Sequence, residues 1–194
     1  MSKKVFIIGF NRTATKAIHE LFKNSGYSSA HYSLANPETG EPVIIAQQMR
    51  LNYFNFKPLL WGMDQFQCYS DLFWHREDEW VDANKYYPML YDAYPDSYFI
   101  LNTRDMDSWL QSKENHKEGD YITRCQQYHK LNRIEQLAWF RSDRDEVEIT
   151  MRRYFASKEN SKFLEFHIEN DSVTKLIDFL KPDFFLDENE WVHV

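Results

Sequence analysis

The stretch that decides the fold is Lys3-Lys4-Val5-Phe6-Ile7-Ile8-Gly9-Phe10-Asn11-Arg12-Thr13-Ala14-Thr15-Lys16-Ala17-Ile18-His19-Glu20-Leu21-Phe22-Lys23-Asn24. Its apolar residues Val5–Ile8 predict a short buried strand, and Phe10–Lys16 predict a tight polar turn. Residues 17–24 predict a helix that stops at Ser25-Gly26. Because a helix N-terminus offers free N–H groups and roughly half a positive charge, this arrangement predicts an anion-binding loop.

The same loop resembles a nucleoside-triphosphate loop only in part. Arg12, Thr13, Thr15 and Lys16 supply donors around the anion. In the pattern G-x-x-x-x-G-K-[ST], however, the second glycine is replaced by Ala14 and the residue after Lys16 is Ala17. Ala17 has no hydroxyl for Mg²⁺, on which phosphoryl transfer from a nucleoside triphosphate depends. The loop therefore indicates anion binding more strongly than it indicates ATP chemistry.

The rest of the chain alternates predicted strands with predicted helices. Further strands are expected over 28–34, 59–68, 97–103 and 162–168, and helices over 43–54, 87–94, from 107 or 108 onward, 121–140, 146–155 and 172–180. This alternation predicts a three-layer α/β fold, with a parallel sheet of about five strands flanked by helices. We expect one domain over 1–194, with a helical region at about 113–160. Ligands of such sheets bind at the carboxyl ends of the strands.

Composition narrows the class of protein. A net charge of −7 argues against binding to nucleic acid. Cys68 and Cys125 have no metal-type spacing, so both are expected to be reduced. The run Val5–Ile8 is too short for a signal peptide or a membrane span, which favours a cytoplasmic protein. The oligomeric state cannot be read from the sequence.

A second motif follows the predicted strand 97–103. Arg104 comes directly after this strand, and Ser112 follows eight residues later, within a predicted helix. An arginine fork and a serine hydroxyl converging from strand end and helix would suit a second phosphate. The alternative is a strand-end arginine that pairs with Asp105 or Asp107.

Together the two motifs resemble those of sulfotransferases that use 3′-phosphoadenosine 5′-phosphosulfate (PAPS). The family signature P-[KR]-[ST]-G-T-[ST] corresponds to Asn11–Lys16, and its strand-end arginine with a serine eight positions on corresponds to Arg104 and Ser112. Residues 90–97 and 166–171 are also similar to a branch of small sulfotransferases. The resemblance implies a P-loop-like fold and a reaction without metal.

The resemblance also implies roles for these residues. Residues 11–16 would hold the 5′-phosphosulfate, while Arg104 and Ser112 would hold the 3′-phosphate of PAPS and of the product, adenosine 3′,5′-bisphosphate (PAP). Three residues depart from the signature: Asn11 replaces proline, Ala14 replaces glycine and Lys16 replaces the second hydroxyl. At Ala14 the turn must either avoid positive φ or be strained.

Catalysis requires charge stabilisation and a base. Arg12 and Lys16 are the candidates to stabilise the leaving phosphate. His31 occupies about the position after the second strand where several sulfotransferases carry a glutamate, so it is the first candidate for the base, with Asp64 and Asp71 as rivals. The run 75–79, which contains one histidine and several charges, is expected to be a solvated turn rather than a metal site.

The sequence does not identify the acceptor, and it leaves two other classes of function as alternatives. A small molecule or carbohydrate is expected as acceptor of the sulfuryl group, and a lipid headgroup and a peptide stay open as alternatives. Several aromatic residues are candidates either to stack on its ring or to fill the core: Tyr53, Phe54, Phe56, Trp61, Tyr121, Tyr128 and Trp139. A kinase-like phosphotransferase and a non-catalytic nucleotide-binding relative are the alternatives.

Overall fold

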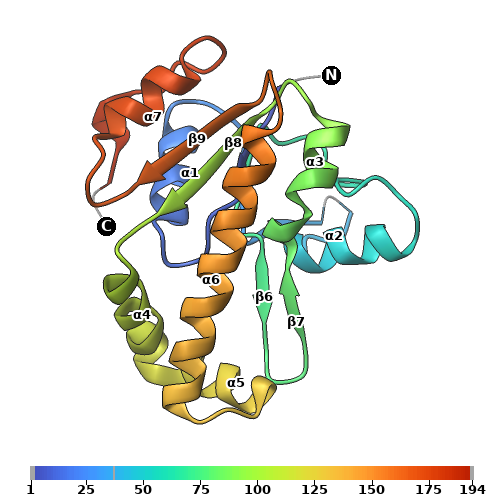
Figure 1. Ribbon diagram of the computed structural model, residues 1–194. Helices are drawn as coiled ribbons and strands as arrows, with labels where there is room; N and C mark the ends of the chain where they lie inside the picture. The colour runs from blue at the N-terminus through green and yellow to red at the C-terminus, as the bar shows by residue number, and fades with distance from the viewer. Residues whose placement is uncertain (1–2, 37, 193–194) are drawn as a thin grey trace.

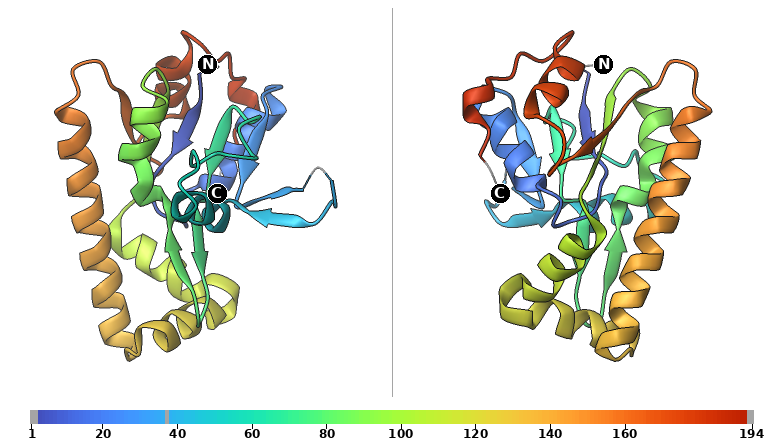
Figure 2. Two further views of the ribbon diagram at one scale, coloured as in Figure 1. Left: turned by 90° about the vertical axis from the view of Figure 1, so that its right-hand side faces the viewer. Right: turned by 60° about the vertical axis from the view of Figure 1, so that its left-hand side comes forward.

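A seven-stranded sheet runs through the centre of the protein, with helices on both faces (Figures 1 and 2). The computed structural model describes residues 3–36 and 38–192. The strands follow the order β4-β3-β2-β5-β1-β8-β9. Their bounds are β1 Val5–Ile7, β2 Ser29–His31, β3 Ser33–Ala35, β4 Pro42–Ile44, β5 Cys68–Ser70, β8 Tyr98–Thr103 and β9 Lys162–His167. The five strands β2, β5, β1, β8 and β9 are parallel, and β3 and β4 extend the sheet in antiparallel fashion.

Alternating side chains of the central strands create the two sides of the core. Val5 and Ile7 of β1 pack with the face that carries α1 (Thr15–Asn24) and α7 (Val173–Leu180). Phe6 and Ile8 pack on the opposite face. That face is covered by α2 (Ile45–Phe54), α3 (Tyr87–Ala93) and α6 (Arg133–Ala156). The expected three-layer α/β fold with five parallel strands is confirmed.

A smaller part of the molecule lies beyond the carboxyl ends of the strands, in the lower half of Figure 1. It contains α4 (Met106–Asn115), the 3₁₀ turn η2 (His116–Gly119), α5 (Asp120–His129) and the first half of α6. It also contains the hairpin of β6 (Phe73–His75) and β7 (Trp80–Asp82), which continues into η1 (Ala83–Tyr86). A separate apolar cluster, including Phe10, Trp109 and Phe140, fills this part. A last 3₁₀ turn, η3, spans Glu188–Glu190.

Several predicted boundaries were wrong. The strand expected over 28–34 is two strands, because the chain reverses at Tyr32, whose φ is 60°. The strand expected over 59–68 is also displaced: residues 59–67 form turns, and β5 begins only at Cys68. The helix cap expected at Asp107 or Ser108 is Asp105, whose Oδ1 accepts from the Ser108 N–H at 2.9 Å. The hairpin of β6 and β7 was missed altogether.

The helical region also divides differently from the prediction. The helix expected over 121–140 is interrupted after His129, where Lys130 has a φ of 57°. Asn132 and Glu135 then form a capping box that starts α6, which continues through the helix expected over 146–155. That residues 1–194 form a single domain stays a prediction.

Candidate active site

The loop between β1 and α1 has a backbone that few side chains favour. Arg12 and Ala14 have φ values of 68° and 62°, in the left-handed region. Ala14 is therefore strained where the glycine of the sulfotransferase signature would be relaxed, which settles the choice left open by the sequence. Ala14 is also the N-cap of α1, and its methyl group cannot accept a hydrogen bond from the first N–H groups of the helix. The first N–H groups of α1 consequently remain available to an anion.

Asn102 on β8 fixes the shape of this loop from beneath. Its Oδ1 accepts from the Gly9 N–H at 3.0 Å, and its Nδ2 donates to the Thr13 carbonyl at 2.7 Å and to Thr13 Oγ1 at 2.6 Å. A side chain on Gly9 would lie 2.0 Å from the carbonyl oxygen of Asn102, so only glycine fits there. The Thr13 hydroxyl donates to the Phe10 carbonyl and is fully buried. Thr13 therefore shapes the loop, while Thr15 begins α1 with 6% of its surface exposed.

The two predicted phosphate-binding motifs are in direct contact. Arg12 Nε donates to Ser112 Oγ on α4 at 3.1 Å. Arg104, by contrast, pairs with Glu169: its Nη2 and Nε lie 2.6 and 3.0 Å from Glu169 Oε1. Glu169 also accepts from the Asp105 N–H at 3.0 Å. The partner of Arg104 is thus a carboxylate distant in sequence, and neither Asp105 nor Asp107 takes that place.

His31 and Asp71 meet at the carboxyl ends of β2 and β5. His31 Nε2 lies 3.9 Å from Asp71 Oδ2, and its Nδ1 lies 3.0 Å from Ser70 Oγ. The His31 ring also stacks on His19, with 5.3 Å between ring centroids. Burial, reinforced by His19 and Lys16, lowers the pKa of His31 to about 4. His31 is therefore neutral at pH 7, but its conjugate acid is strong and it is a weak base.

The pKa of Asp71 is shifted upward, in contrast to that of His31. Burial raises its pKa to about 6, against the opposing effect of Lys113 and Arg12. Its φ of 54° is in the left-handed region, a backbone strain that recurs at functional sites. At pH 7 most of the Asp71 carboxyl is ionised, and its pKa is near the operating pH that suits a general base. Of the two groups, Asp71 has the pKa better suited to accept a proton.

Asp64, the third candidate base, lies at the wrong end of the sheet. It precedes β5, and its Oδ1 is 3.0 Å from Lys4 Nζ, next to the start of β1. Tyr94 OH also donates to Asp64 at 2.8 Å. The structure therefore does not bring Asp64 to the site. The error follows from the displaced strand, because residues 59–67 form turns and β5 begins only at Cys68, after Asp64.

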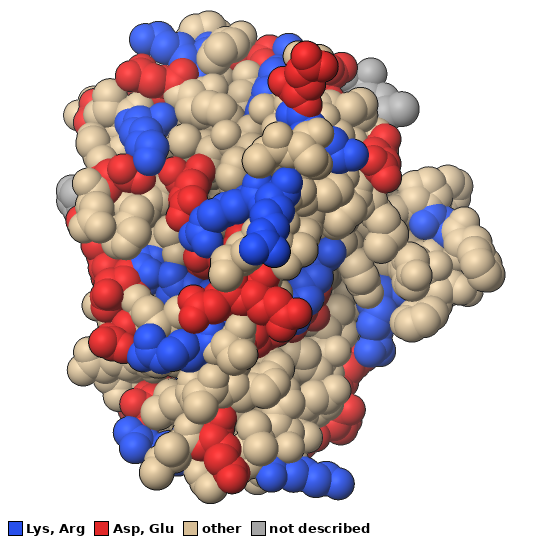
Figure 3. Space-filling view, in the orientation of Figure 1, with Lys and Arg blue, Asp and Glu red and all other residues tan. Residues whose placement is uncertain are grey.

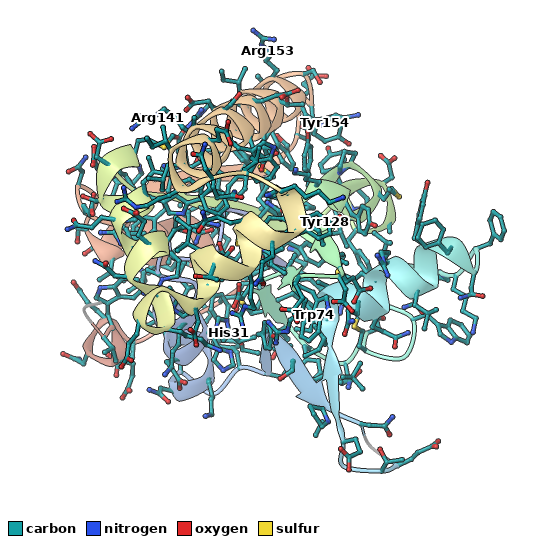
Figure 4. The ribbon with its side chains drawn as sticks, turned by 90° about the horizontal axis from the view of Figure 1, so that it is seen from below. His31, Trp74, Tyr128, Arg141, Arg153 and Tyr154 are labelled. Carbon is teal, nitrogen blue, oxygen red and sulfur yellow. The ribbon has the colours of Figure 1, made fainter. Side chains whose placement is uncertain are left out.

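A cavity of about 400 Å³ opens beside the loop. It lies at the carboxyl ends of the strands, between the sheet and the helical part, and Figure 4 looks toward this region from below. In this view His31 and Trp74 lie on one side of α5 and the long helix α6 lies on the other. The lining residues come from the loop, the start of α1, the carboxyl end of β2, both ends of β6 and the residues just after β2, β5 and β6, and from η2 and α5: Asn11, Lys16, His31, Tyr32, Asp71, Phe73, His75, Arg76, His116, Lys117, Tyr121 and Arg124.

The wall of this cavity contains a buried hydrogen-bond chain that the sequence did not predict. The Tyr121 hydroxyl accepts from Lys113 Nζ at 3.1 Å and from Asn11 Nδ2 at 3.3 Å. Its remaining partner is His75 Nδ1 at 2.7 Å, and His75 Nε2 lies 2.6 Å from Asp82 Oδ1. Because Lys113 and Asn11 both donate to this oxygen, the Tyr121 hydroxyl donates its own proton to His75 Nδ1. The single N–H of neutral His75, on Nε2, then donates to Asp82. Tyr121 is thus fixed at the loop, from which Asn11 reaches it.

His75 corrects the prediction for the run 75–79. Only residues 76–79 form the turn between β6 and β7, with Glu77 and Asp78 exposed, whereas His75 is buried with 6% of its surface exposed. Burial lowers the pKa of His75 to about 4, against the effect of Asp82. Burial alone would raise the pKa of Asp82, but His75 and Lys85 lower it instead. A neutral His75 next to an ionised Asp82 agrees with the hydrogen bonds described above, in which His75 Nδ1 accepts from Tyr121 and Nε2 donates to Asp82.

Among residues 3–36 and 38–192, no three His, Cys, Asp or Glu side chains are grouped so that they could bind a metal ion. Within the same residues no helix is long and apolar enough to cross a membrane.

Comparison with known families agrees with the resemblance of the two motifs. The model of the sulfotransferase domain family matches residues 4–178, which include the opening loop, Arg104 and Ser112. The chain therefore belongs to the sulfotransferase domain family. No curated protein matches the chain.

Proposed function

We propose that this protein transfers the sulfuryl group of PAPS to a hydroxyl or amine of a small-molecule or carbohydrate acceptor and releases PAP. The observation that carries the proposal is the 3.1 Å contact between Arg12 of the opening loop and Ser112 of the second motif. The opening loop and the second motif thus meet at the carboxyl ends of the strands. Two anion-binding motifs in contact suit a nucleotide with phosphates at two positions. The match of the sulfotransferase domain over residues 4–178 supports the same class of reaction.

In this proposal the residues of the loop stabilise charge. Sulfuryl transfer is an in-line displacement at sulfur, so positioning and stabilisation of the leaving oxygen supply most of the catalysis. Arg12, Lys16 and the first N–H groups of α1 would hold the 5′-phosphosulfate, and Arg104 and Ser112 the 3′-phosphate. The pair of Arg104 with Glu169 orients the guanidinium while its second terminal nitrogen stays available to the phosphate.

We assign the base to Asp71, with neutral His31 at 3.9 Å as its neighbour. The acceptor oxygen would bond to sulfur as the bond from sulfur to the phosphate oxygen of PAP breaks, and the acceptor proton would pass to Asp71. The pKa of Asp71, raised by burial to about 6, supports Asp71 as the base rather than His31, whose pKa is lowered to about 4. We also propose a cytoplasmic location, which the two free, buried cysteines support.

Calorimetry tests the proposal against the kinase-like alternative. PAP should bind far more tightly than ATP with Mg²⁺, and equal or reversed affinities would overturn the assignment. Arg104→Ala should weaken PAP binding about tenfold or more, because a charge-assisted contact to phosphate is lost, and should leave adenosine 5′-phosphate binding unchanged. Arg153→Ala, an exposed position on α6 labelled in Figure 4, removes the same charge and should change neither affinity. Tight PAP binding without transfer to any acceptor would instead indicate a non-catalytic relative.

A further inference from the structure

The cavity beside the opening loop is lined by basic side chains without acidic partners. Arg76, Lys117 and Arg124 line it together with Lys16, and Asp71 is the one carboxylate in the lining. None of these four basic residues forms an ion pair in the part of the chain that the structure describes. The cavity is therefore a cationic site in a protein whose net charge is −7.

The outer surface differs from this cavity. On the face shown in Figure 3, acidic and basic side chains are interspersed. Several of the pairs are explicit, such as Arg152 with Glu165 at 2.7 Å and Lys175 with Asp171 at 2.7 Å. Basic residues on this face thus commonly form ion pairs with carboxylates, whereas the four of the cavity wall form none within the described part of the chain.

Arg76 and Arg124 are held in ways that leave donors for a ligand. The Arg76 guanidinium stacks on Trp74, with its carbon 4.0 Å from the ring centroid, and donates to the Tyr32 hydroxyl at 3.4 Å and the His75 carbonyl at 3.1 Å. Stacking of this kind fixes the plane of a guanidinium without neutralising it. Arg124 Nε is buried and has no hydrogen-bond partner among the described residues. A buried N–H without a partner is a costly feature that a bound acceptor atom would relieve.

The segment that brings Lys117 to the cavity is strained. Lys117 and Glu118 in η2 have φ values of 52° and 56°, a conformation that non-glycine residues rarely adopt. This strained turn places His116 and Lys117 in the lining of the cavity. Backbone strain of this kind persists where it positions residues for binding or catalysis.

We propose that the acceptor of the sulfuryl group carries an anionic group of its own, a carboxylate, phosphate or sulfate, and that Arg76 and Arg124 bind it. The proposal rests on the proposed function, because it assigns this cavity to the acceptor and the opening loop to the donor. A planar guanidinium fork suits a carboxylate or a phosphate better than a hydroxyl or a neutral ring. The anion would be held on the β6–α5 side of the cavity, with the hydroxyl or amine directed to Asp71 and the loop.

Calorimetry on the PAP-loaded protein tests this with matched pairs of probes. 4-Hydroxybenzoate is compared with 4-hydroxybenzamide, and glucuronate with glucose. The anionic member of at least one pair should bind about tenfold more tightly or better, because hydrogen bonds to a charged group are lost in the neutral one. Arg76→Gln and Arg124→Gln should each remove about tenfold of that affinity, whereas Arg153→Gln on the outer face of α6 should not.

The outcomes separate this inference from the proposed function. Equal binding of both members, or no binding of either pair, overturns the anionic acceptor. So does a loss of PAP affinity in Arg76→Gln or Arg124→Gln, because these arginines would then belong to the donor site. If PAP itself does not bind while the anionic probes are still preferred, the proposed function is overturned and the anion site stands.

Discussion

Lys113 gives the sharpest prediction about stability, because it is a buried cation that forms no ion pair with a carboxylate among the described residues. Its Nζ lies 4.6 Å from the ring centroid of Trp109 and 4.5 Å from that of Phe140, and it donates to the Tyr121 hydroxyl at 3.1 Å. The residue is 1% exposed. Burial lowers the pKa of Lys113 from 10.5 to about 8, so the group is still charged at pH 7 at a cost in folding free energy.

The size and sign of that cost follow from the pKa. The unfolded chain keeps the proton up to about pH 10.5, while the folded protein releases it at about pH 8. The contribution of Lys113 to the free energy of unfolding is therefore least favourable below pH 8 and rises between pH 8 and 10.5, by about 3 kcal/mol. Met has nearly the same length and no charge, so Lys113→Met should raise the free energy of unfolding at pH 7 by up to about 3 kcal/mol. Tyr121 keeps His75 and Asn11 as partners in the variant.

Urea unfolding of the wild type and of Lys113→Met at pH 7 and pH 10 measures this directly. The advantage of the variant should be largest at pH 7 and shrink at pH 10, where the folded wild type has lost the charge. Lys57→Met at an exposed position is the control and should change stability by less than about 0.5 kcal/mol. A variant less stable than the wild type at pH 7 would show that the aromatic rings fully compensate the burial of the charge. An advantage equal at both pH values would show that the charge is not its cause, and either result would refute the reasoning.

Three further changes test the site. Once an acceptor is identified, kcat/KM should fall about tenfold per pH unit below pH 6, because Asp71 becomes protonated. Asp71→Asn should abolish this dependence. A fall only below about pH 4 would instead assign the base to His31. Asn102→Ala removes three buried hydrogen bonds and should lower the free energy of unfolding, measured in urea, by about 3 kcal/mol; a loss below about 1 kcal/mol would contradict its role in holding the loop. Ala14→Gly should relieve left-handed strain and change stability by less than about 1 kcal/mol in its favour, whereas Ala17→Gly in the same helix should lose about 1 kcal/mol; equal losses would mean that Ala14 is unstrained.

Local patterns predicted the parts of the site that depend on neighbouring residues. The loop at Asn11–Lys16 lies between a buried strand and a helix start, and Arg104 follows the apolar strand β8. Such strand–turn–helix signals are readable because periodicity and breakers are local. The three-layer fold was predicted in this way, whereas the sulfotransferase family was predicted from the resemblance of the two motifs to its signatures.

Long-range pairing was not readable. His75 meets Tyr121 across 46 residues, from a hairpin that the sequence did not reveal. Lys113 in a charged helix is indistinguishable by pattern from a solvated lysine, and only the packing of Trp109 and Phe140 buries it. Asp64 was misplaced because the start of β5 is set by pairing with β1 and β2 rather than by the apolar residues before it.

The proposed transfer of a sulfuryl group from PAPS is tested most directly by following ³⁵S from labelled PAPS in a mixture of hydroxyl and amine acceptors, both anionic and neutral, with EDTA present. We predict that the wild type transfers the label to an acceptor and that Arg12→Ala loses about 10²-fold or more of the rate, since it removes a donor to the leaving phosphate. If the label stays in PAPS with every acceptor, or moves equally well with Arg12→Ala, the account is contradicted.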